Sequence, residues 1–247
     1  MDLYQLLRDL VTLDTTSGHE QPATDYLAAT LARAGWQVTR QPVAPGRENL
    51  YAIREPPVVV FSTHLDTVPP YRPLHETAEI FFGRGTCDAK GIAAAMVTAA
   101  EQLAAAGERR VGLLFVVGEE NGSDGAKAAA TLGPRGKYLV NGEPTENRLT
   151  IGQKGVLRVD LHAEGRAAHS AYPEEGRSAV LPLLDSIRAI LALDLPADSL
   201  LGATTCNVGT IEGGVAPNVI AKFARLMGGD YFRSGILGSY LVGSPEE

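Results

Sequence analysis

Cysteine, aromatic residues and long apolar runs are scarce in this chain of 247 residues, which has two cysteines and 6% aromatic residues. Two cysteines, Cys87 and Cys206, are too few for a disulfide framework, and few aromatics disfavour a base-stacking surface. The longest apolar runs, residues 58–61 and 111–117, fall far short of the ~20 residues that span a membrane. The N-terminus lacks the basic stretch and apolar block of a signal peptide. We therefore expect a cytoplasmic protein with reduced thiols that binds no membrane, a single disulfide between the two cysteines being the alternative.

Positive charge is also in the minority, since 22 Lys and Arg stand against 29 Asp and Glu, a net charge of −7. This balance argues against a nucleic-acid-binding protein, which needs a clustered basic face. Hydrophobic residues make up 45% of the chain, enough to bury a core, which excludes a mainly disordered protein. The length allows one large domain or two smaller ones.

Short apolar strands alternate with helical patterns through the first 140 residues. Apolar spacing predicts helices at residues 2–13, 23–34, 91–106 and 125–132. Strands are predicted at residues 36–41, 58–62, 111–117 and 138–140. This order implies parallel strands joined by crossover helices, so we expect an α/β fold with a mixed, mostly parallel sheet sandwiched by helices.

The pattern changes after Glu143. Residues 149–163 resemble a β-hairpin around two glycines, a helix is predicted at 178–193, and a strand at 204–211. We expect a smaller α+β domain at residues 154–230 and a first domain formed by residues 1–153 with 231–247. Within the last segment, residues 236–242 are predicted to return to the first domain as a strand.

Polar side chains follow three of the predicted parallel strands, and one more precedes the helix at 91–106. Ligand sites of open α/β sheets lie beyond the carboxyl ends of the strands. That edge would collect one histidine and up to five carboxylates: His64, Asp66, Asp88, Glu119, Glu120 and Glu143.

Such crowded carboxylates repel one another, and burying unpaired charges is costly, so a bound cation is the simplest resolution. Imidazole with carboxylates and no thiolate suits Zn²⁺, Mn²⁺ or Co²⁺, and the ligands would suffice for two metals. Each signal alone has an ordinary explanation. The pair at His64 and Asp66 could be a satisfied core pair, the two glutamates a solvated turn, and Asp88 a residue favoured by a helix dipole. Their recurrence at consecutive strand ends favours a site.

Four segments in order carry a family resemblance: HLDTVP at 64–69, GRGTCDAKG at 83–91, EE at 119–120 and GEPT at 142–145. Together they resemble the M20 metallopeptidases, a family that includes acetylornithine deacetylase, succinyl-diaminopimelate desuccinylase, aminoacylase-1 and carboxypeptidase G2. The segment SGHE at 17–20 is similar too, and the resemblance runs from residue 3 to about residue 220. It implies a zinc-peptidase-like fold with a lid or dimerisation domain.

By the same resemblance, the protein hydrolyses an amide bond in an N-acyl amino acid or small peptide, and analogy favours the acetylornithine or acetyl-lysine deacetylase type. A dipeptidase or carboxypeptidase of the family is the alternative. The metal ligands implied are His64, Asp88, Glu120 and Glu143, with Asp88 bridging two metals. Zinc is expected, with cobalt or manganese as alternatives.

The catalytic roles also come from the resemblance. Glu119 is implied as the general base that deprotonates the bridging water, and Asp66 as the acceptor of the other ring N–H of His64. Segments 165–170, 176–179 and 213–220 resemble the family's lid, which implies that His169 stabilises the oxyanion across a homodimer and that Asn218 contacts the substrate carboxylate. An ordinary loop histidine is the alternative for His169.

The chain departs from the family pattern near its end. A large part of the lid has no counterpart near residues 221–229, and Ser244 stands about where the family has its last histidine ligand. Either segments are missing from the sequence, which we favour, or this is a shortened homologue with one metal. If that ligand is truly absent, a non-catalytic binding protein is the alternative function.

Two further chemistries are weaker. Gly83-x-Gly85 resembles the start of a dinucleotide fingerprint, but Asp88 occupies the third glycine position. Cys87 could serve as a thiol nucleophile, although a small residue beside a metal-binding carboxylate is more often a packing residue.

Overall fold

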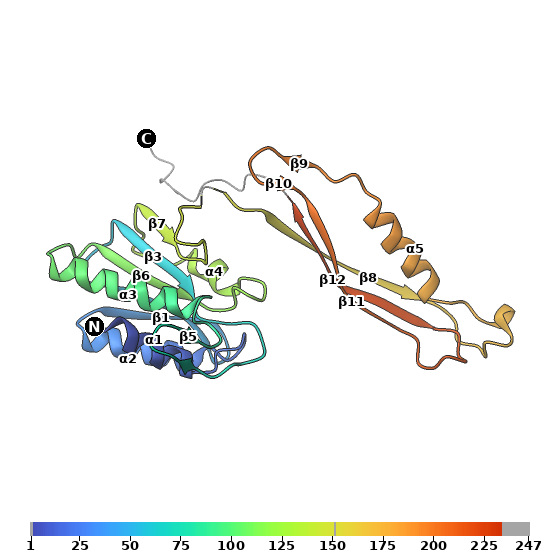
Figure 1. Cartoon of the computed structure of the whole chain (residues 1–247), viewed down its shortest axis with the longest axis horizontal. Helices are drawn as coiled ribbons and strands as arrows, with labels where there is room; N and C mark the ends of the chain where they lie inside the picture. The colour runs from blue at the N-terminus through green and yellow to red at the C-terminus, as the bar shows by residue number, and fades with distance from the viewer. Residues whose placement is uncertain (1, 151, 234–247) are drawn as a thin grey trace. The chain divides into compact units, whose positions relative to one another are not determined.

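The computed structural model describes residues 2–150 and 152–233. The chain divides into two compact units, the first ending at Leu149 and the second beginning at Thr150 (Figure 1). The assignment of a catalytic domain and a lid domain, with the limits given above, stays a prediction. Among the described residues, no helix combines the length and apolar character needed to cross a membrane.

The first unit contains a five-stranded mixed sheet in the order β1-β2-β6-β3-β7. Its strands are β1 (Gln37–Ala44), β2 (Arg47–Ile53), β3 (Val59–His64), β6 (Val111–Val116) and β7 (Tyr138–Asn141). Strand β3 pairs in parallel with both β6 and β7, whereas β2 pairs antiparallel with β1 and β6. A short hairpin of β4 (His75–Glu76) and β5 (Phe81–Phe82) forms a separate sheet. The parallel half of the main sheet therefore matches the predicted strands closely.

Helices cover both faces of this sheet (Figure 1). They are α1 (Leu3–Thr12), α2 (Gln21–Arg33), α3 (Lys90–Ala105) and α4 (Asp124–Ala129). Helices α1, α2 and α3 share one apolar core with Leu50 and Ala52 of β2. Asn49 and Tyr51 alternate with these residues and hydrogen-bond to Gly125 and Pro134. Because successive strand residues point to opposite faces, α4 lies on the other side.

The first helix shows why the local sequence folds as it does. Asp2 caps α1, since its side chain accepts a hydrogen bond from the backbone N–H of Gln5 at 2.7 Å, which satisfies one of the free donors of the first turn. Leu6 and Leu10 recur at helical spacing and are buried, so one face of the helix enters the core.

The second unit is a three-stranded antiparallel sheet in the order β11-β12-β8 with one helix packed on it. The strands are β8 (Gly155–Glu164), β11 (Thr205–Gly213) and β12 (Phe223–Arg233), and the helix is α5 (Val180–Leu191). Leu183 and Ile187 of α5 pack against Ala224 and Leu226 of β12. A 3₁₀ turn, η1 (Pro173–Glu175), and a small hairpin of β9 (Ala197–Asp198) and β10 (Gly202–Ala203) complete it.

Two predictions about strands differ from the structure. The hairpin predicted at residues 149–163 is wrong, because β8 begins at Gly155 and its partner is the distant strand β12. Strand β2 was not predicted, since it begins with Arg47-Glu48-Asn49 and shows no clean alternation. The strand predicted at 236–242 lies outside the described residues. Residues 223–233 form the single strand β12, with one irregularity between Leu226 and Gly229. This strand begins within residues 221–229, near which a large part of the family's lid has no counterpart in this sequence.

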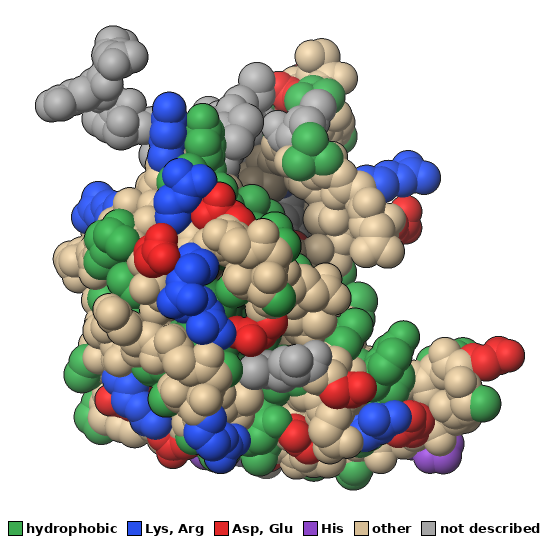
Figure 2. All heavy atoms as spheres, turned by 90° about the vertical axis from the view of Figure 1, so that its left-hand side faces the viewer, with side chains coloured by type: hydrophobic (Ala, Val, Ile, Leu, Met, Phe, Trp, Pro, Cys, Tyr) green, Lys and Arg blue, Asp and Glu red, His purple; other side chains and the backbone are tan. Residues whose placement is uncertain are grey.

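Charges of both signs are mixed on the surface. Arg109 pairs with Glu55 and Arg110 with Glu108. On the face shown in Figure 2, acidic side chains lie between the basic ones.

Candidate metal centre

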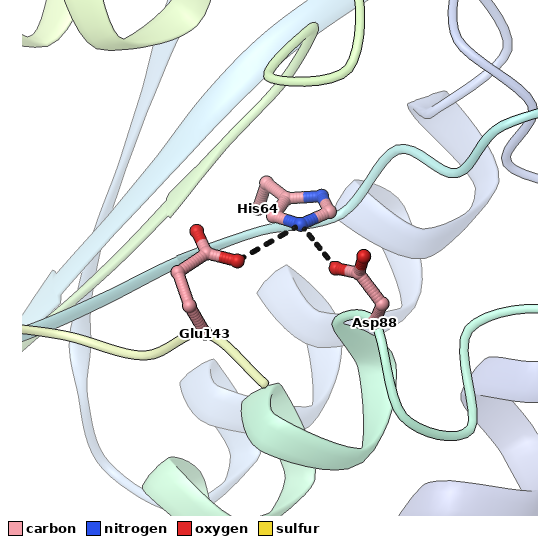
Figure 3. A group of neighbouring side chains, drawn as sticks. All are labelled: His64, Asp88 and Glu143. Atoms are coloured by element: carbon pink, nitrogen blue, oxygen red, sulfur yellow. Dashed lines mark hydrogen bonds and ion pairs between the residues drawn. The ribbon is translucent and has the colours of Figure 1, made fainter. Parts of the chain in front are cut away.

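Three of the predicted ligands meet at the carboxyl edge of the parallel strands. His64 is the last residue of β3, Glu143 follows β7 by two residues, and Asp88 precedes α3 by two. The Nε2 atom of His64 lies 2.8 Å from Oδ1 of Asp88 and 3.7 Å from Oε2 of Glu143 (Figure 3). One ligand atom from each of the three lies within 4.8 Å of the others, so these side chains can share one cation.

His64 is anchored from behind. Its Nδ1 lies 2.9 Å from the backbone carbonyl oxygen of Asp66, and because a carbonyl only accepts, Nδ1 carries the hydrogen. Nε2 therefore faces Asp88 and Glu143. The imidazole is 1% exposed, whereas the side chains of Asp88 and Glu143 are 48% and 36% exposed. Solvent thus reaches the group from the carboxylate side.

The electrostatics of His64 reflect these neighbours. Burial lowers its pKa, but the carboxylates of Asp66 and Glu143 raise it by more, so the pKa of His64 rises to about 11. Without a cation, the imidazole is protonated at neutral pH. A proton thus holds the position between the carboxylates that a metal ion would take.

Asp66 contacts more residues of the site than the sequence indicated. Its Oδ1 accepts the backbone N–H of Glu119 at 3.0 Å, and its Oδ2 accepts that of Glu120 at 3.1 Å. Oδ2 also accepts the hydroxyl of Ser17 at 2.7 Å, and Oδ1 lies 3.5 Å from Nδ1 of His64. Burial raises the pKa of Asp66, but contacts with His64, Ser17 and the Glu119 N–H outweigh it, and the pKa falls below its usual value.

Glu119 and Glu120 lie in the loop after β6, adjacent to the group of three. Burial is the main cause that raises the pKa of both carboxyls. The charge of Asp88 comes next for Glu120, whereas Glu143 is the chief acidic neighbour of Glu119. Among the described residues, the close group contains His64, Asp88 and Glu143 without Glu120. The donor set of one imidazole and two carboxylates fits Zn²⁺, Mn²⁺ or Co²⁺.

The glycines that resemble a dinucleotide fingerprint have a packing role. A Cβ on Gly85 would lie 2.7 Å from Cδ of Lys90, so the glycine makes room for that side chain. Lys90 is fully buried, and its Nζ donates to the carbonyl of Leu13 at 2.6 Å. The segment before α3 therefore encloses a lysine, which disfavours the nucleotide interpretation.

His169 and Asn218 belong to the second unit. His169 forms an isolated antiparallel bridge with Val219, and the backbone carbonyl of Asn218 accepts the N–H of Ser170 at 3.0 Å. Nδ1 of His169 accepts the N–H of Ala171 at 3.1 Å. Both side chains are exposed. The two predicted residues thus lie on adjoining segments, and their roles stay predictions.

Sequence comparison agrees with these motifs. The model for peptidase family M20/M25/M40 matches residues 60–225. A peptidase M20 domain-containing protein of Schizosaccharomyces pombe is 40% identical over 234 residues, which cover 91% of this chain and 58% of the relative. A probable carboxypeptidase of Aspergillus clavatus is 41% identical over 248 residues, covering 88% of this chain and 55% of the relative. The chain belongs to peptidase family M20/M25/M40, and it spans somewhat more than half the length of these relatives.

Solved structures confirm the predicted fold class. An M20 family metallo-carboxypeptidase from Sulfolobus solfataricus superposes with a TM-score of 0.73 at 18% identity, covering 94% of this chain and 71% of that one. A tripeptidase from Staphylococcus aureus gives a TM-score of 0.67 at 23% identity, covering 93% of this chain and 65% of that one. At these identities the likeness concerns the fold.

Proposed function

We propose that this protein is a metal-dependent hydrolase that cleaves the amide bond of an N-acyl amino acid or short peptide on the amino side of a residue with a free carboxylate. The observation that carries the proposal is the group formed by His64, Asp88 and Glu143 at the sheet edge. Membership of a peptidase family supports hydrolysis as the reaction.

Each residue at the edge has a role that suits its surroundings. His64, Asp88 and Glu143 would hold one metal ion, and Asp88 with Glu120 would contribute to a second, zinc being the first candidate with cobalt or manganese as alternatives. When bound, the metal would polarise the scissile carbonyl and make a water molecule more acidic.

Glu119 would carry the proton. Burial raises the pKa of this carboxyl, which makes it a stronger base than an exposed glutamate. It would take a proton from the attacking water and deliver it to the leaving amine. Asp66 would keep the backbone of Glu119 and the ring of His64 in place, through the contacts described above.

The names of the relatives favour one substrate type. The sequence resemblance alone favours deacetylation of acetylornithine or acetyl-lysine, whereas a relative 41% identical is named a probable carboxypeptidase. We therefore place carboxypeptidase activity first and deacetylation second. Both reactions release an amino acid with a free carboxylate, for which Asn218 is the proposed contact. We further propose a cytoplasmic homodimer in which His169 stabilises the oxyanion in the site of the second subunit.

The test is a substrate panel with the purified protein reconstituted with zinc, manganese or cobalt. N-blocked dipeptides, the same dipeptides amidated at the C-terminus, and N-acetyl amino acids should be compared with and without a strong chelator. We expect metal-dependent cleavage of the N-blocked dipeptides that have a free C-terminal carboxylate, and no cleavage of the amidated dipeptides. Preference for the acetyl amino acids would restore the deacetylase assignment. Substrate binding without turnover by any metal-loaded form would make the protein a binding protein.

The homodimer is tested separately. Light scattering at micromolar protein should give twice the chain mass. A fully active monomer would contradict the proposed action of His169 across subunits.

A further inference from the structure

The loop between β6 and α4, residues 118–123, carries Glu119 and Glu120 and is here called the glutamate loop. Its two ends are tied to each other. The N–H of Ser123 donates to the carbonyl of Gly118 at 2.7 Å, and the N–H of Gly125 donates to that of Val117 at 3.0 Å. These two backbone hydrogen bonds join the ends of the loop without the help of another element.

Asn49 of β2 reinforces this closure. Its Oδ1 accepts the N–H of Val117 at 3.1 Å, and its Nδ2 donates to the carbonyl of Gly125 at 2.7 Å. One fully buried side chain therefore links the residues on either side of the glutamate loop. A buried amide with both ends satisfied holds a backbone more rigidly than a solvated one.

Arg47, two residues earlier on β2, reaches the loop itself. A Cβ on Gly118 would collide with Nη2 of Arg47, and Gly118 has a φ of +70°, so the guanidinium lies directly on the loop backbone. Its Nη1 lies 3.9 Å from Oδ2 of Asp124, the first residue of α4. One rigid planar group therefore adjoins the start of the glutamate loop and the residue that follows its end.

Glu20 holds that guanidinium in place. Nε and Nη2 of Arg47 donate to the two carboxylate oxygens of Glu20 at 2.9 and 2.7 Å. The Glu20 side chain is fully buried and that of Arg47 is 16% exposed. A buried pair of this kind adds little net stability, because desolvation offsets most of the attraction. Its two parallel hydrogen bonds do fix the orientation of the guanidinium.

We propose that Glu20 and Arg47 are positioning residues that fix the backbone at Gly118, and through it the directions in which Glu119 and Glu120 point. The catalytic consequence rests on the proposed function. Asp66 holds the glutamate N–H groups from the side of His64, and the Arg47–Glu20 pair supports the same loop from the side of β2 and α2. The two glutamates are thereby held from both sides.

The decisive variant removes the pair without leaving a buried charge, by combining Glu20→Leu with Arg47→Met. Replacing both partners with apolar residues of similar size is commonly tolerated, so we expect a folded protein. Arg40→Met is the matched control, because Arg40 on the neighbouring strand pairs with Asp25 of α2 in a more exposed position.

Three readouts separate positioning from general support. Hydrogen exchange of the glutamate loop should quicken about tenfold in the double variant and stay unchanged in the control. The rate constant kcat should fall about tenfold while KM changes less than about twofold. Metal affinity at the group of His64, Asp88 and Glu143 should stay as in the wild type, since none of these three lies in the loop.

A folded double variant with wild-type loop exchange and kcat would overturn the proposal. If the double variant fails to fold, Arg47→Lys decides, because lysine keeps a charge for Glu20 but lacks the fork that reaches Gly118. It should show an intermediate gain in loop exchange, and wild-type exchange would refute the idea. A wild-type protein without metal binding or hydrolysis would contradict the proposed function, whereas the exchange comparison would still test the positioning role.

Discussion

Replacing Asp66 by asparagine tests how the site is held together in the absence of metal. The two carboxylate oxygens accept hydrogen bonds from the N–H groups of Glu119 and Glu120 and from the hydroxyl of Ser17. Asparagine has one acceptor oxygen, which would serve Glu120 and Ser17 on the Oδ2 side. Its NH₂ group would then face the N–H of Glu119, so two donors would meet in a fully buried position.

The expected cost follows from these contacts. A hydrogen bond to a charged group contributes about 1.5–3 kcal/mol, and a buried donor left without an acceptor costs about 1–3 kcal/mol. Asp66→Asn leaves the N–H of Glu119 without an acceptor and weakens the hydrogen bonds from Glu120 and Ser17, because their acceptor is no longer charged. We therefore expect the free energy of unfolding to fall by about 3 kcal/mol. The charged imidazole of His64 also loses one of its carboxylate neighbours, which acts in the same direction.

The single tryptophan provides the assay. Trp36 is 5% exposed and lies in the core of the first unit, so its fluorescence reports unfolding of the unit that contains Asp66. Denaturant titrations should be made at pH 7 with chelator present. Asp14→Asn is the control, since Asp14 accepts two hydrogen bonds from Thr16 at an exposed position. Its cost should be about 1 kcal/mol or less.

The pH dependence gives a second check with a defined sign. The pKa of Asp66 lies below its ordinary value of 3.8 in the folded protein. Its contribution to stability is therefore present above pH 3.8 and is lost as the pH falls toward the folded pKa. The difference in free energy of unfolding between the wild type and Asp66→Asn should be constant above about pH 5 and should become smaller below that pH. A variant within about 1 kcal/mol of the wild type at pH 7 would refute the reasoning.

Four further outcomes are expected. Glu119→Gln should keep metal and lower kcat at least ~10²-fold, whereas Glu120→Gln should reduce metal occupancy; the reverse pattern in metal analysis would exchange the two roles. Because the pKa of His64 is raised to about 11, binding should displace a proton, and titration calorimetry should show metal affinity rising about tenfold per pH unit near neutrality; a flat profile would contradict this. His169→Ala should lower kcat with metal content unchanged, and an unchanged kcat would leave it an ordinary loop histidine. Leu10→Ala, at a fully buried core position, should cost about 2–5 kcal/mol in denaturant unfolding, and a loss below this range would mean that the core closes around the gap.

The parallel part of the first sheet was predictable because its strands are short apolar runs. Residues 58–62 and 111–117 of the sequence correspond to β3 (Val59–His64) and β6 (Val111–Val116). Strands buried on both faces read as continuous apolar segments, and their ends place His64 and the glutamate loop at one edge. The order of these segments was therefore sufficient to predict that His64 and the two glutamates lie at the same edge of the sheet, although Glu120 is not part of the close group of His64, Asp88 and Glu143.

Strand β2 was not predictable by the same signal, and for a physical reason. It begins with Arg47 and Asn49, polar residues that resemble a loop in isolation. In the folded chain their partners are Glu20, Val117 and Gly125, which are far away in sequence. A polar pair at alternate positions before the apolar run at residues 50–53 was the available sign of such tertiary contacts.

The roles of Ser17 and the Asp66 carboxylate also depend on long-range contacts. Ser17 stood in a recognised motif, but nothing local indicates that its hydroxyl donates a hydrogen bond to Asp66, 49 positions later.

The wrongly predicted hairpin at residues 149–163 has the opposite cause. Its glycines resembled a turn, while the true partner of β8 lies in β12, and local patterns cannot choose among distant partners.

If the site binds a divalent cation as proposed, its charges explain how one group of residues would serve both a metal-free and a metal-bound protein. Without metal, burial and mutual repulsion raise the pKa of Glu119 and Glu120, and the proton on His64 offsets part of the negative charge. A divalent cation would replace that proton at Nε2 and supply more positive charge at the same point. The hydrogen bond from Nδ1 to the carbonyl of Asp66 is available in both states, so the ring need not turn when proton and metal exchange. The imidazole would thus be held in the orientation that metal binding requires before any metal arrives.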